Sequence, residues 1–145
     1  MTKKETVEKA VSLFNEGYAC SQAVLLAFAD RFDLDEKTAK RLSSTFGAGM
    51  GRLREKCGAL SGSFMVLGLA YGNDDPKDNV KKLSSYKKVR DLNQKFKDFY
   101  HTTSCAEIIQ QHATPRQVEE RMHHALICHQ VVEDAAGMLY DILEG

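Results

Sequence analysis

The residues of this sequence best suited to chemistry are its four cysteines, Cys20, Cys57, Cys105 and Cys128. Cys57 stands in the segment Lys56-Cys57-Gly58-Ala59-Leu60-Ser61-Gly62, which leads into the most apolar run of the chain, residues 59–71. Thiolates attack disulfides, react with oxidants and bind soft metals. Four cysteines in a cytosolic chain point to catalytic, redox-sensing or metal-binding roles more than to structural disulfides. We therefore expect the fold to bring some or all of these sulfurs close together.

Three of the cysteines, Cys20, Cys57 and Cys105, fall in the first turn of a predicted helix. A helix N-terminus offers free N–H groups and the positive end of the helix dipole, and both favour a thiolate. Such a position can lower the pKa of a cysteine below its usual value of about 8.5. Cys128 lies inside its predicted helix on the inward side, where a thiol can serve as a small core residue. The shared position of the other three favours a functional role.

The cysteines support three hypotheses. In the first, the protein carries out thiol–disulfide exchange or redox sensing with a partner protein or a small thiol. Cys57, left unshielded by Gly58, is then the attacking thiolate, and one of Cys20, Cys105 or Cys128 resolves the mixed disulfide. In the second, all four thiolates bind zinc or an iron–sulfur cluster, for which four is the right number of ligands. In the third, the chain is a helical binding module whose cysteines are incidental. We rank the redox hypothesis first and the metal hypothesis a close second.

Histidines near the cysteines leave a mixed Cys/His zinc site open. His124 and Cys128 are four residues apart on one predicted helix, so their side chains can meet. His101 precedes Cys105 by four residues, but a helix break separates them, and His129 falls on a core-facing stripe. No Cys-x-x-Cys or His-x-x-x-His motif is present. That missing spacing favours hydrogen-bonded structural histidines over metal ligands.

Length and composition predict an ordinary soluble domain. The 145 residues fit one domain, residues 1–145, and 43% are hydrophobic and 28% charged. The net charge is zero, which argues against a general binder of nucleic acid or of acidic membranes. The first residues lack the apolar stretch of a signal peptide, and no apolar run is long enough to span a bilayer. We expect a cytoplasmic protein that is not inserted in a membrane.

Glycine and proline divide the chain into segments of helical length, and none alternates like a strand, so we predict an all-α fold. The predicted helices cover residues 2–16, 19–30, 34–45, 56–70, 76–100, a short segment from 105, and 115–143. Four Ser/Thr/Asp-x-x-Glu/Gln patterns mark helix starts, at Thr2, Asp33, Ser104 and Thr114. Asp75-Pro76 is a fifth start signal. The result is a compact single-domain bundle of six or seven helices with a long C-terminal helix.

The apolar patterns predict which helices are central. Residues 19–30 are apolar almost all round, and Gly58 and Gly62 lie one turn apart on the helix over 56–70, where they indicate close contact with another helix. That glycine face makes a homodimer one alternative. Two helices carry core-facing stripes. The stripe over 76–100 comprises Val80, Leu83, Tyr86, Val89, Leu92, Phe96 and Phe99, and the C-terminal stripe comprises Val118, Met122, Ala125, His129, Val132, Ala136, Leu139 and Leu143.

A glycine-rich loop, Gly47-Ala48-Gly49-Met50-Gly51-Arg52, precedes the Cys57 segment. Alternate glycines let a backbone turn tightly or approach another group closely. The loop lacks the Gly-x-Gly-x-x-Gly pattern, a preceding strand and a Gly-Lys-Ser/Thr sequence, so it does not indicate a nucleotide site.

Taken in order, Cys20, the segment Cys57-Gly58-Ala59-Leu60-Ser61-Gly62, Cys105 and Cys128 resemble the C_GCAxxG_C_C family of redox-active proteins, which are bacterial and archaeal. Residues 17–24 (Gly-Tyr-Ala-Cys-Ser-Gln-Ala-Val) also resemble the family's first cysteine block, and residues 46–51 its glycine loop. The resemblance covers nearly the whole chain. It implies a role for all four cysteines, and a functional link to a transporter, because members are often encoded near transporter genes. It names no substrate and does not separate redox chemistry from metal binding.

Overall fold

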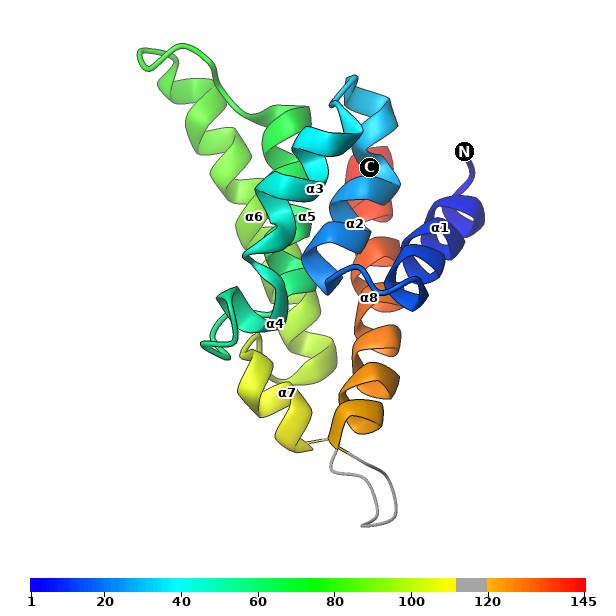
Figure 1. Cartoon of the computed structure of the whole chain (residues 1–145). Helices are drawn as coiled ribbons and strands as arrows, with labels where there is room; N and C mark the ends of the chain where they lie inside the picture. Colours follow the sequence, from blue (N-terminus) through cyan, green and yellow to red (C-terminus); the bar gives the residue numbers. More distant parts are fainter. Residues whose placement is uncertain (112–119) are drawn as a thin grey trace.

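A computed structural model describes residues 1–111 and 120–145, with side chains described from residue 125 onward in the second range (Figure 1). Its helices are α1 (Lys3–Asn15), α2 (Cys20–Ala29), a 3-10 turn (Asp30–Phe32), α3 (Glu36–Ser44), α4 (Gly47–Met50), α5 (Gly58–Tyr71), α6 (Asn79–Tyr100), α7 (Cys105–Gln111) and α8 (Glu120–Glu144). In these residues there is no strand, only an isolated bridge between Lys56 and Ser104. The all-α prediction with a long C-terminal helix is confirmed, with seven α-helices besides the four-residue α4. The start signal at Thr114 lies outside the described residues.

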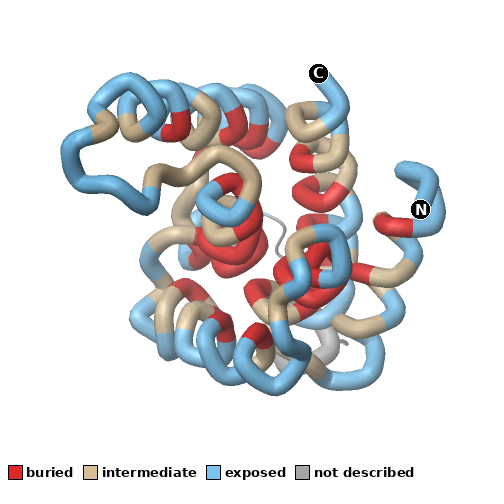
Figure 2. The backbone as a smooth tube through the Cα atoms, turned by 90° about the horizontal axis from the view of Figure 1, so that it is seen from above, coloured by how far each residue is buried: buried red, intermediate tan, exposed pale blue. Residues whose placement is uncertain are grey.

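The core forms around α2, α5 and α8, as the apolar patterns predict. Eight of the ten residues of α2 are buried, and α2 packs along α5 while α1 and α3 cover its other sides. Helix α8 contributes Val131, Val132, Ala135, Ala136 and Leu139, which form its buried stripe. Seen from above, the buried residues gather on the facing sides of these helices (Figure 2). None of the described helices combines the length and apolarity needed to cross a membrane.

Two glycines allow the close contact between α2 and α5. A Cβ atom at position 62 would lie 2.5 Å from the carbonyl oxygen of Ser21, and one at position 58 would overlap the sulfur of Cys20. The predicted helix contact is therefore made within the chain, so the glycine face is covered and not free for a second subunit. A homodimer stays a prediction. Gly68 on the same helix has open space around it.

Two predicted helix starts are wrong. Helix α3 begins after Asp35, whose carboxylate accepts hydrogen bonds from the N–H and hydroxyl of Thr38, both at 2.8 Å, while Asp33 adopts a left-handed conformation with φ 53°. Helix α6 begins after Asp78 rather than at Pro76, because Asp78 accepts from the backbone of Lys81 at 3.0 Å. In both cases a second aspartate two or three residues later takes the capping position. The capping box predicted at Thr2 is confirmed.

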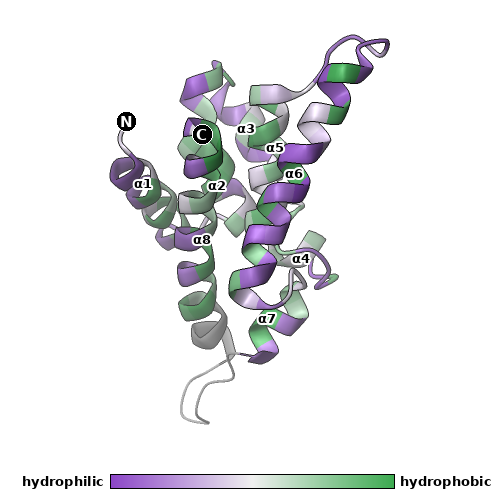
Figure 3. Ribbon diagram, turned by 180° about the vertical axis from the view of Figure 1, so that it is seen from behind, coloured by the Kyte–Doolittle hydropathy of each residue, from purple (hydrophilic) through white to green (hydrophobic). Residues whose placement is uncertain are grey.

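The stripe predicted on α6 is only partly inward. Leu92 and Phe96 are fully buried, but Val80 is 83% exposed, and Leu83, Tyr86 and Phe99 are also exposed. From behind, α6 runs along the outside of the bundle with a largely hydrophilic surface (Figure 3). Its first half therefore extends past the core, and the helical spacing alone did not reveal where the supporting helices end. The C-terminal stripe is confirmed at Val132, Ala136 and Leu139, whereas Ala125 is exposed.

The two glycine environments on α5 give a test of the packing. We expect Gly62→Ala to destabilise the fold by about 2 kcal/mol or more, because the added methyl meets the backbone of α2. Gly68→Ala is the matched control on the same helix, and we expect it to stabilise the fold by about 0.5–1 kcal/mol through helix propensity. Urea unfolding followed by circular dichroism measures both. Equal effects of the two substitutions would contradict the close α2–α5 contact.

Candidate functional site

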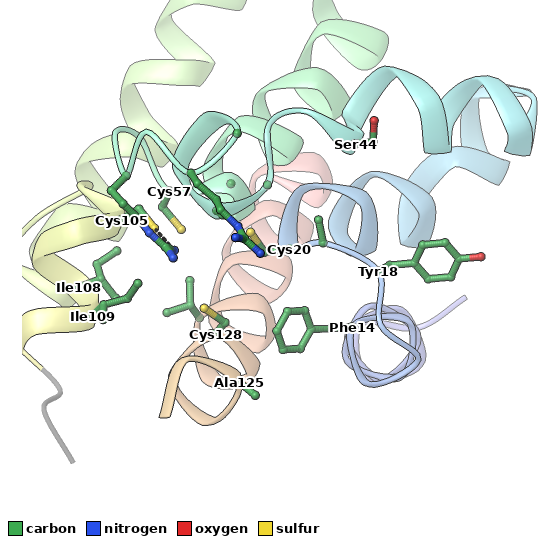
Figure 4. A pocket seen from close by; sticks show the side chains of 18 of the residues that line it. Phe14, Tyr18, Cys20, Ser44, Cys57, Cys105, Ile108, Ile109, Ala125 and Cys128 are labelled. Atoms are coloured by element: carbon green, nitrogen blue, oxygen red, sulfur yellow. Dashed lines mark hydrogen bonds between the residues drawn. The ribbon is translucent and has the colours of Figure 1, made fainter. Parts of the chain in front are cut away.

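All four cysteines line one pocket of about 580 Å³. Cys20 is the first residue of α2, Cys57 is the N-cap of α5, Cys105 is the first residue of α7, and Cys128 lies inside α8. Figure 4 shows their side chains around the same space, with apolar neighbours such as Phe14, Ile108 and Ile109. All four cysteines are free thiols in this structure. The expectation that the fold gathers the sulfurs is therefore confirmed for the whole set.

A short antiparallel pairing holds Cys57 and Cys105 on the same side of the pocket. The N–H of Cys57 donates to the carbonyl of Thr103 at 2.8 Å, and the N–H of Cys105 donates to the carbonyl of Glu55 at 2.6 Å. Lys56 and Ser104 stand opposite each other between these bonds. In such a pairing, Cys57 and Cys105 are diagonal neighbours whose side chains lie on one face. The bridge thus fixes the start of α5 to the start of α7.

Gly58 makes room for Cys20 instead of exposing Cys57. The position that a Cβ at residue 58 would take is next to the Cys20 sulfur, and it is 2.8 Å from the carbonyl oxygen of Phe46. Cys57 itself is only 6% exposed, and Cys105 is 8% exposed, whereas Cys20 and Cys128 are half-buried. The expectation that Gly58 leaves the Cys57 sulfur unshielded is wrong. Cys20 and Cys128 are the more accessible thiols of the pocket.

Burial reverses the predicted direction of the pKa shift at Cys20 and Cys57. It raises the pKa of Cys57 well above its usual value, and the neighbouring Cys20 adds to this, while the N–H groups of Ala59 and Leu60 lower it by less. Burial likewise raises the pKa of Cys20, against a smaller lowering by the N–H of Ala48. The pKa of Cys128 rises to about 12, mainly through burial. The helix N-termini act as expected at Cys20 and Cys57, but desolvation outweighs them.

The glycine loop folds into a turn with left-handed backbone conformation. Five consecutive residues have positive φ: Ala48 (55°), Gly49 (68°), Met50 (69°), Gly51 (62°) and Arg52 (69°). Arg54 follows with φ 59°. A left-handed conformation costs a residue other than glycine roughly 1–2 kcal/mol, and such strain gathers at functional sites. The tight turn suggested by the glycines is confirmed, whereas positive φ at alanine, methionine and arginine has no signal in the sequence.

This turn carries two arginines that the sequence did not single out. Arg52 and Arg54 both line the cysteine pocket. A nitrogen of the Arg54 guanidinium donates to the Cys105 sulfur at 3.7 Å, and Arg54 also lowers the pKa of Cys128. Gly49 permits this arrangement, because a Cβ there would lie 2.7 Å from both the Cα of Arg54 and the Cβ of Cys105. The only sequence signal was the position of the arginines between the glycine loop and the Cys57 segment.

Neither His101 nor His129, the histidines whose side chains are described, lines the cysteine pocket. His101 is exposed and ends α6 in a left-handed conformation, and His129 lines a different hollow beside α1. The side chain of His124 lies outside the described residues. Among the side chains that are described, no three of Cys, His, Asp or Glu lie close enough to hold one metal ion. A zinc or iron–sulfur site on Cys20, Cys57, Cys105 and Cys128 thus stays a prediction that requires the thiols to move closer together.

Comparison with known proteins gives one match. The model of a family described as "Putative redox-active protein (C_GCAxxG_C_C)" matches residues 18–142. No curated protein and no solved structure matches the chain significantly. The matched range includes all four cysteines and the glycine loop.

The raised thiol pKa predicts a loss of stability in alkali. A free cysteine has a pKa near 9.0, but Cys128 in the folded protein has a pKa of about 12. As the pH rises above 9, the unfolded chain therefore loses this proton before the folded chain does, and the stability that Cys128 contributes is fully present below pH 9 and is lost toward pH 12. We expect the difference in urea midpoint between the wild type and Cys128→Ala to decrease from pH 8 to pH 11. A difference that stays constant over this range would contradict the raised pKa.

Proposed function

This chain belongs to the C_GCAxxG_C_C family, and we propose that its pocket carries out thiol–disulfide exchange, with Cys20 as the attacking thiol and Cys57 as the resolving thiol. The observation that carries the proposal is the convergence of four free cysteines, from four separate parts of the chain, on one pocket. A pocket of several hundred cubic ångströms is of the size that takes a small molecule. Chemistry on a bound small thiol or disulfide therefore suits it.

Exposure and proximity support the pair Cys20 and Cys57. Cys20 and Cys57 both line the pocket, but Cys20 is half-buried whereas Cys57 is buried. Cys57 is the residue directly before Gly58, whose missing side chain leaves the space that the Cys20 sulfur fills. Among the neighbouring side chains, Cys20 also contributes most to the raised pKa of Cys57. An accessible attacking thiol with a buried resolving thiol next to it is the arrangement that exchange needs.

The exchange runs in two steps. The Cys20 thiolate attacks one sulfur of a disulfide RSSR, the S–S bond breaks, and the released RS⁻ takes up the proton that Cys20 gave up. The Cys57 thiolate then attacks the Cys20 sulfur in the mixed disulfide and releases the second RSH. The substrate gains two electrons and two protons, and the protein gains a Cys20–Cys57 disulfide. A reduced thiol partner reverses both steps.

The exchange needs surroundings that stabilise a thiolate and that keep the thiols reduced. The N–H of Ala48 favours the Cys20 thiolate, and Arg54 favours the Cys128 thiolate, so the pocket can hold the charge that forms during exchange. A reducing compartment such as the cytosol keeps the four thiols available. The partner that reduces the disulfide again is a redox protein or a small thiol. A functional link between this chain and a transporter is a further part of the proposal.

A four-thiolate site for zinc or an iron–sulfur cluster is the second candidate, favoured by the same convergence. Four thiolates are the right number for either group. Metal binding would remove the protons of the thiols. Burial opposes this, because it raises the pKa of Cys57 and of Cys128. The redox proposal ranks first, because it needs only two sulfurs to meet, whereas the metal site needs four, and no three ligand side chains among those described lie close enough to hold one ion.

Disulfide mapping tests the redox pair. We expect reduced, anaerobically purified protein to show four titratable thiols and to lose two of them to diamide, a neutral oxidant, with a Cys20–Cys57 link found by peptide mass spectrometry. Cys20→Ser and Cys57→Ser should each abolish this link, and Cys128→Ser, the matched control in the same pocket, should retain it. Stoichiometric zinc or iron, with thiols blocked until the metal is removed, would replace the redox proposal with the metal site. A different linked pair would overturn the roles given to Cys20 and Cys57.

A further inference from the structure

The described lining of the cysteine pocket carries positive charge, although the chain as a whole is neutral. Among the described residues that line it, the only charged side chains are Arg52 and Arg54, and none is a carboxylate. The remainder of its lining is apolar or small, apart from the four thiols, Tyr18 and Ser44. The whole chain has equal numbers of basic and acidic residues. The two positive charges are therefore a property of this pocket and not of the chain as a whole.

Neither arginine is neutralised by the described part of the protein. The ion pairs found there involve Lys3, Lys9, Arg31, Lys40 and Lys87, all of which lie outside the pocket. The hydrogen bond of the Arg54 guanidinium goes to the Cys105 sulfur. The side chain of Arg52 is exposed and makes no hydrogen bond within those residues. Both guanidinium groups thus keep donors for a ligand.

The backbone is strained at the two positions that carry these charges. Arg52 and Arg54 both have positive φ, at 69° and 59°. The turn is nevertheless held firmly, since the N–H of Glu55 donates to Gly49 at 3.0 Å and the N–H of Ala106 donates to Arg54 at 3.2 Å. Strain that the surrounding structure maintains in this way is typical of residues positioned for a ligand.

We propose that the substrate of this pocket is a small disulfide, or the corresponding thiol, that carries a carboxylate within a few bonds of its sulfur. The inference rests on the thiol–disulfide exchange proposed above and names its substrate class. Arginine binds a carboxylate through two parallel hydrogen bonds, which orients the ligand as well as attracting it. The apolar wall formed by Phe14, Ile108 and Ile109 accommodates the carbon skeleton. Arg52 and Arg54 then hold the substrate so that its S–S bond meets Cys20.

Three disulfides of nearly equal size and different charge test this specificity. They are 3,3′-dithiodipropionate with two negative charges, bis(2-hydroxyethyl) disulfide with none, and cystamine with two positive charges. The measurement is the second-order rate constant for oxidation of the reduced full-length protein by each. Each value is divided by the rate constant of the same disulfide with N-acetylcysteine amide, a neutral free thiol, to remove intrinsic reactivity. We expect the normalised rate constant for the dianion to exceed that for the neutral disulfide by roughly tenfold or more, and that for cystamine to be the lowest.

Variants connect the preference to the arginines. Arg52→Gln and Arg54→Gln should each reduce the preference for the dianion, and the double variant should bring the three normalised rate constants to within about twofold of one another. Glutamine keeps a long polar side chain at each strained position. Arg90→Gln is the matched control, because Arg90 is exposed on α6 outside the pocket, and it should leave the preference unchanged.

The outcomes separate the two proposals. If all three disulfides oxidise the wild type at equal normalised rates, the exchange chemistry stands and the carboxylate substrate is refuted. If the preference survives in the double variant, the arginines are not its origin and the inference is overturned. If none of the disulfides, nor diamide, consumes thiols of the folded protein, the exchange function itself fails.

Discussion

The contact between α2 and α5 is the constraint on which the cysteine site depends. Gly62 lets the backbone of α5 rest against the carbonyl of Ser21, and Gly58 leaves the space that the Cys20 sulfur occupies. A side chain at either position would separate the two helices, and with them Cys20 and Cys57. The bridge between Lys56 and Ser104 then brings α7 and Cys105 to the same place. The glycines of the Cys57 segment thus determine the geometry of the thiols, although they take no part in the chemistry.

The site also shows a competition between two electrostatic effects on the thiols. Helix N-termini favour thiolates, and the backbone N–H groups near Cys20 and Cys57 do lower the pKa of each. Removal from water opposes ionisation more strongly, because the charged form loses its hydration. At neutral pH the raised pKa values therefore keep these thiols protonated, and a protonated thiol reacts less readily with oxidants than a thiolate does. At Cys128, Arg54 is the side chain that offsets part of this cost.

The sequence predicted the elements of the fold better than it predicted the site. Capping at Thr2, the buried character of α2 and the inward residues of α8 follow from local chemistry and from periodicity, and the structure agrees with them. The start of α6 was misplaced because Asp75-Pro76 and Asp78 are both good start signals, and in the structure the Asp75 carboxylate accepts from the N–H of Lys77 in a turn before the helix. The left-handed residues from Ala48 to Arg52 could not be foreseen, since alanine, methionine and arginine disfavour that conformation unless the surrounding structure imposes it. The pKa direction of Cys57 failed for a related reason, because burial depends on all the helices that meet at the pocket.

The distribution of the cysteines along the chain couples the redox state to folding. Each of the four belongs to a different helix or its cap, so a disulfide between any two of them joins two different helices. A bridge between Cys20 and Cys57 would close a loop containing all of α3 and the glycine turn, which corresponds to about 4 kcal/mol of lost chain entropy in the unfolded state. Folding and disulfide formation are therefore coupled, and each favours the other by the same free energy. Oxidation stabilises the folded chain, and folding favours the disulfide because it raises the effective concentration of one thiol near the other. An unfolded chain would therefore be a much weaker electron donor than the folded one, and the capacity to exchange disulfides would be a property of the assembled helices rather than of a local motif.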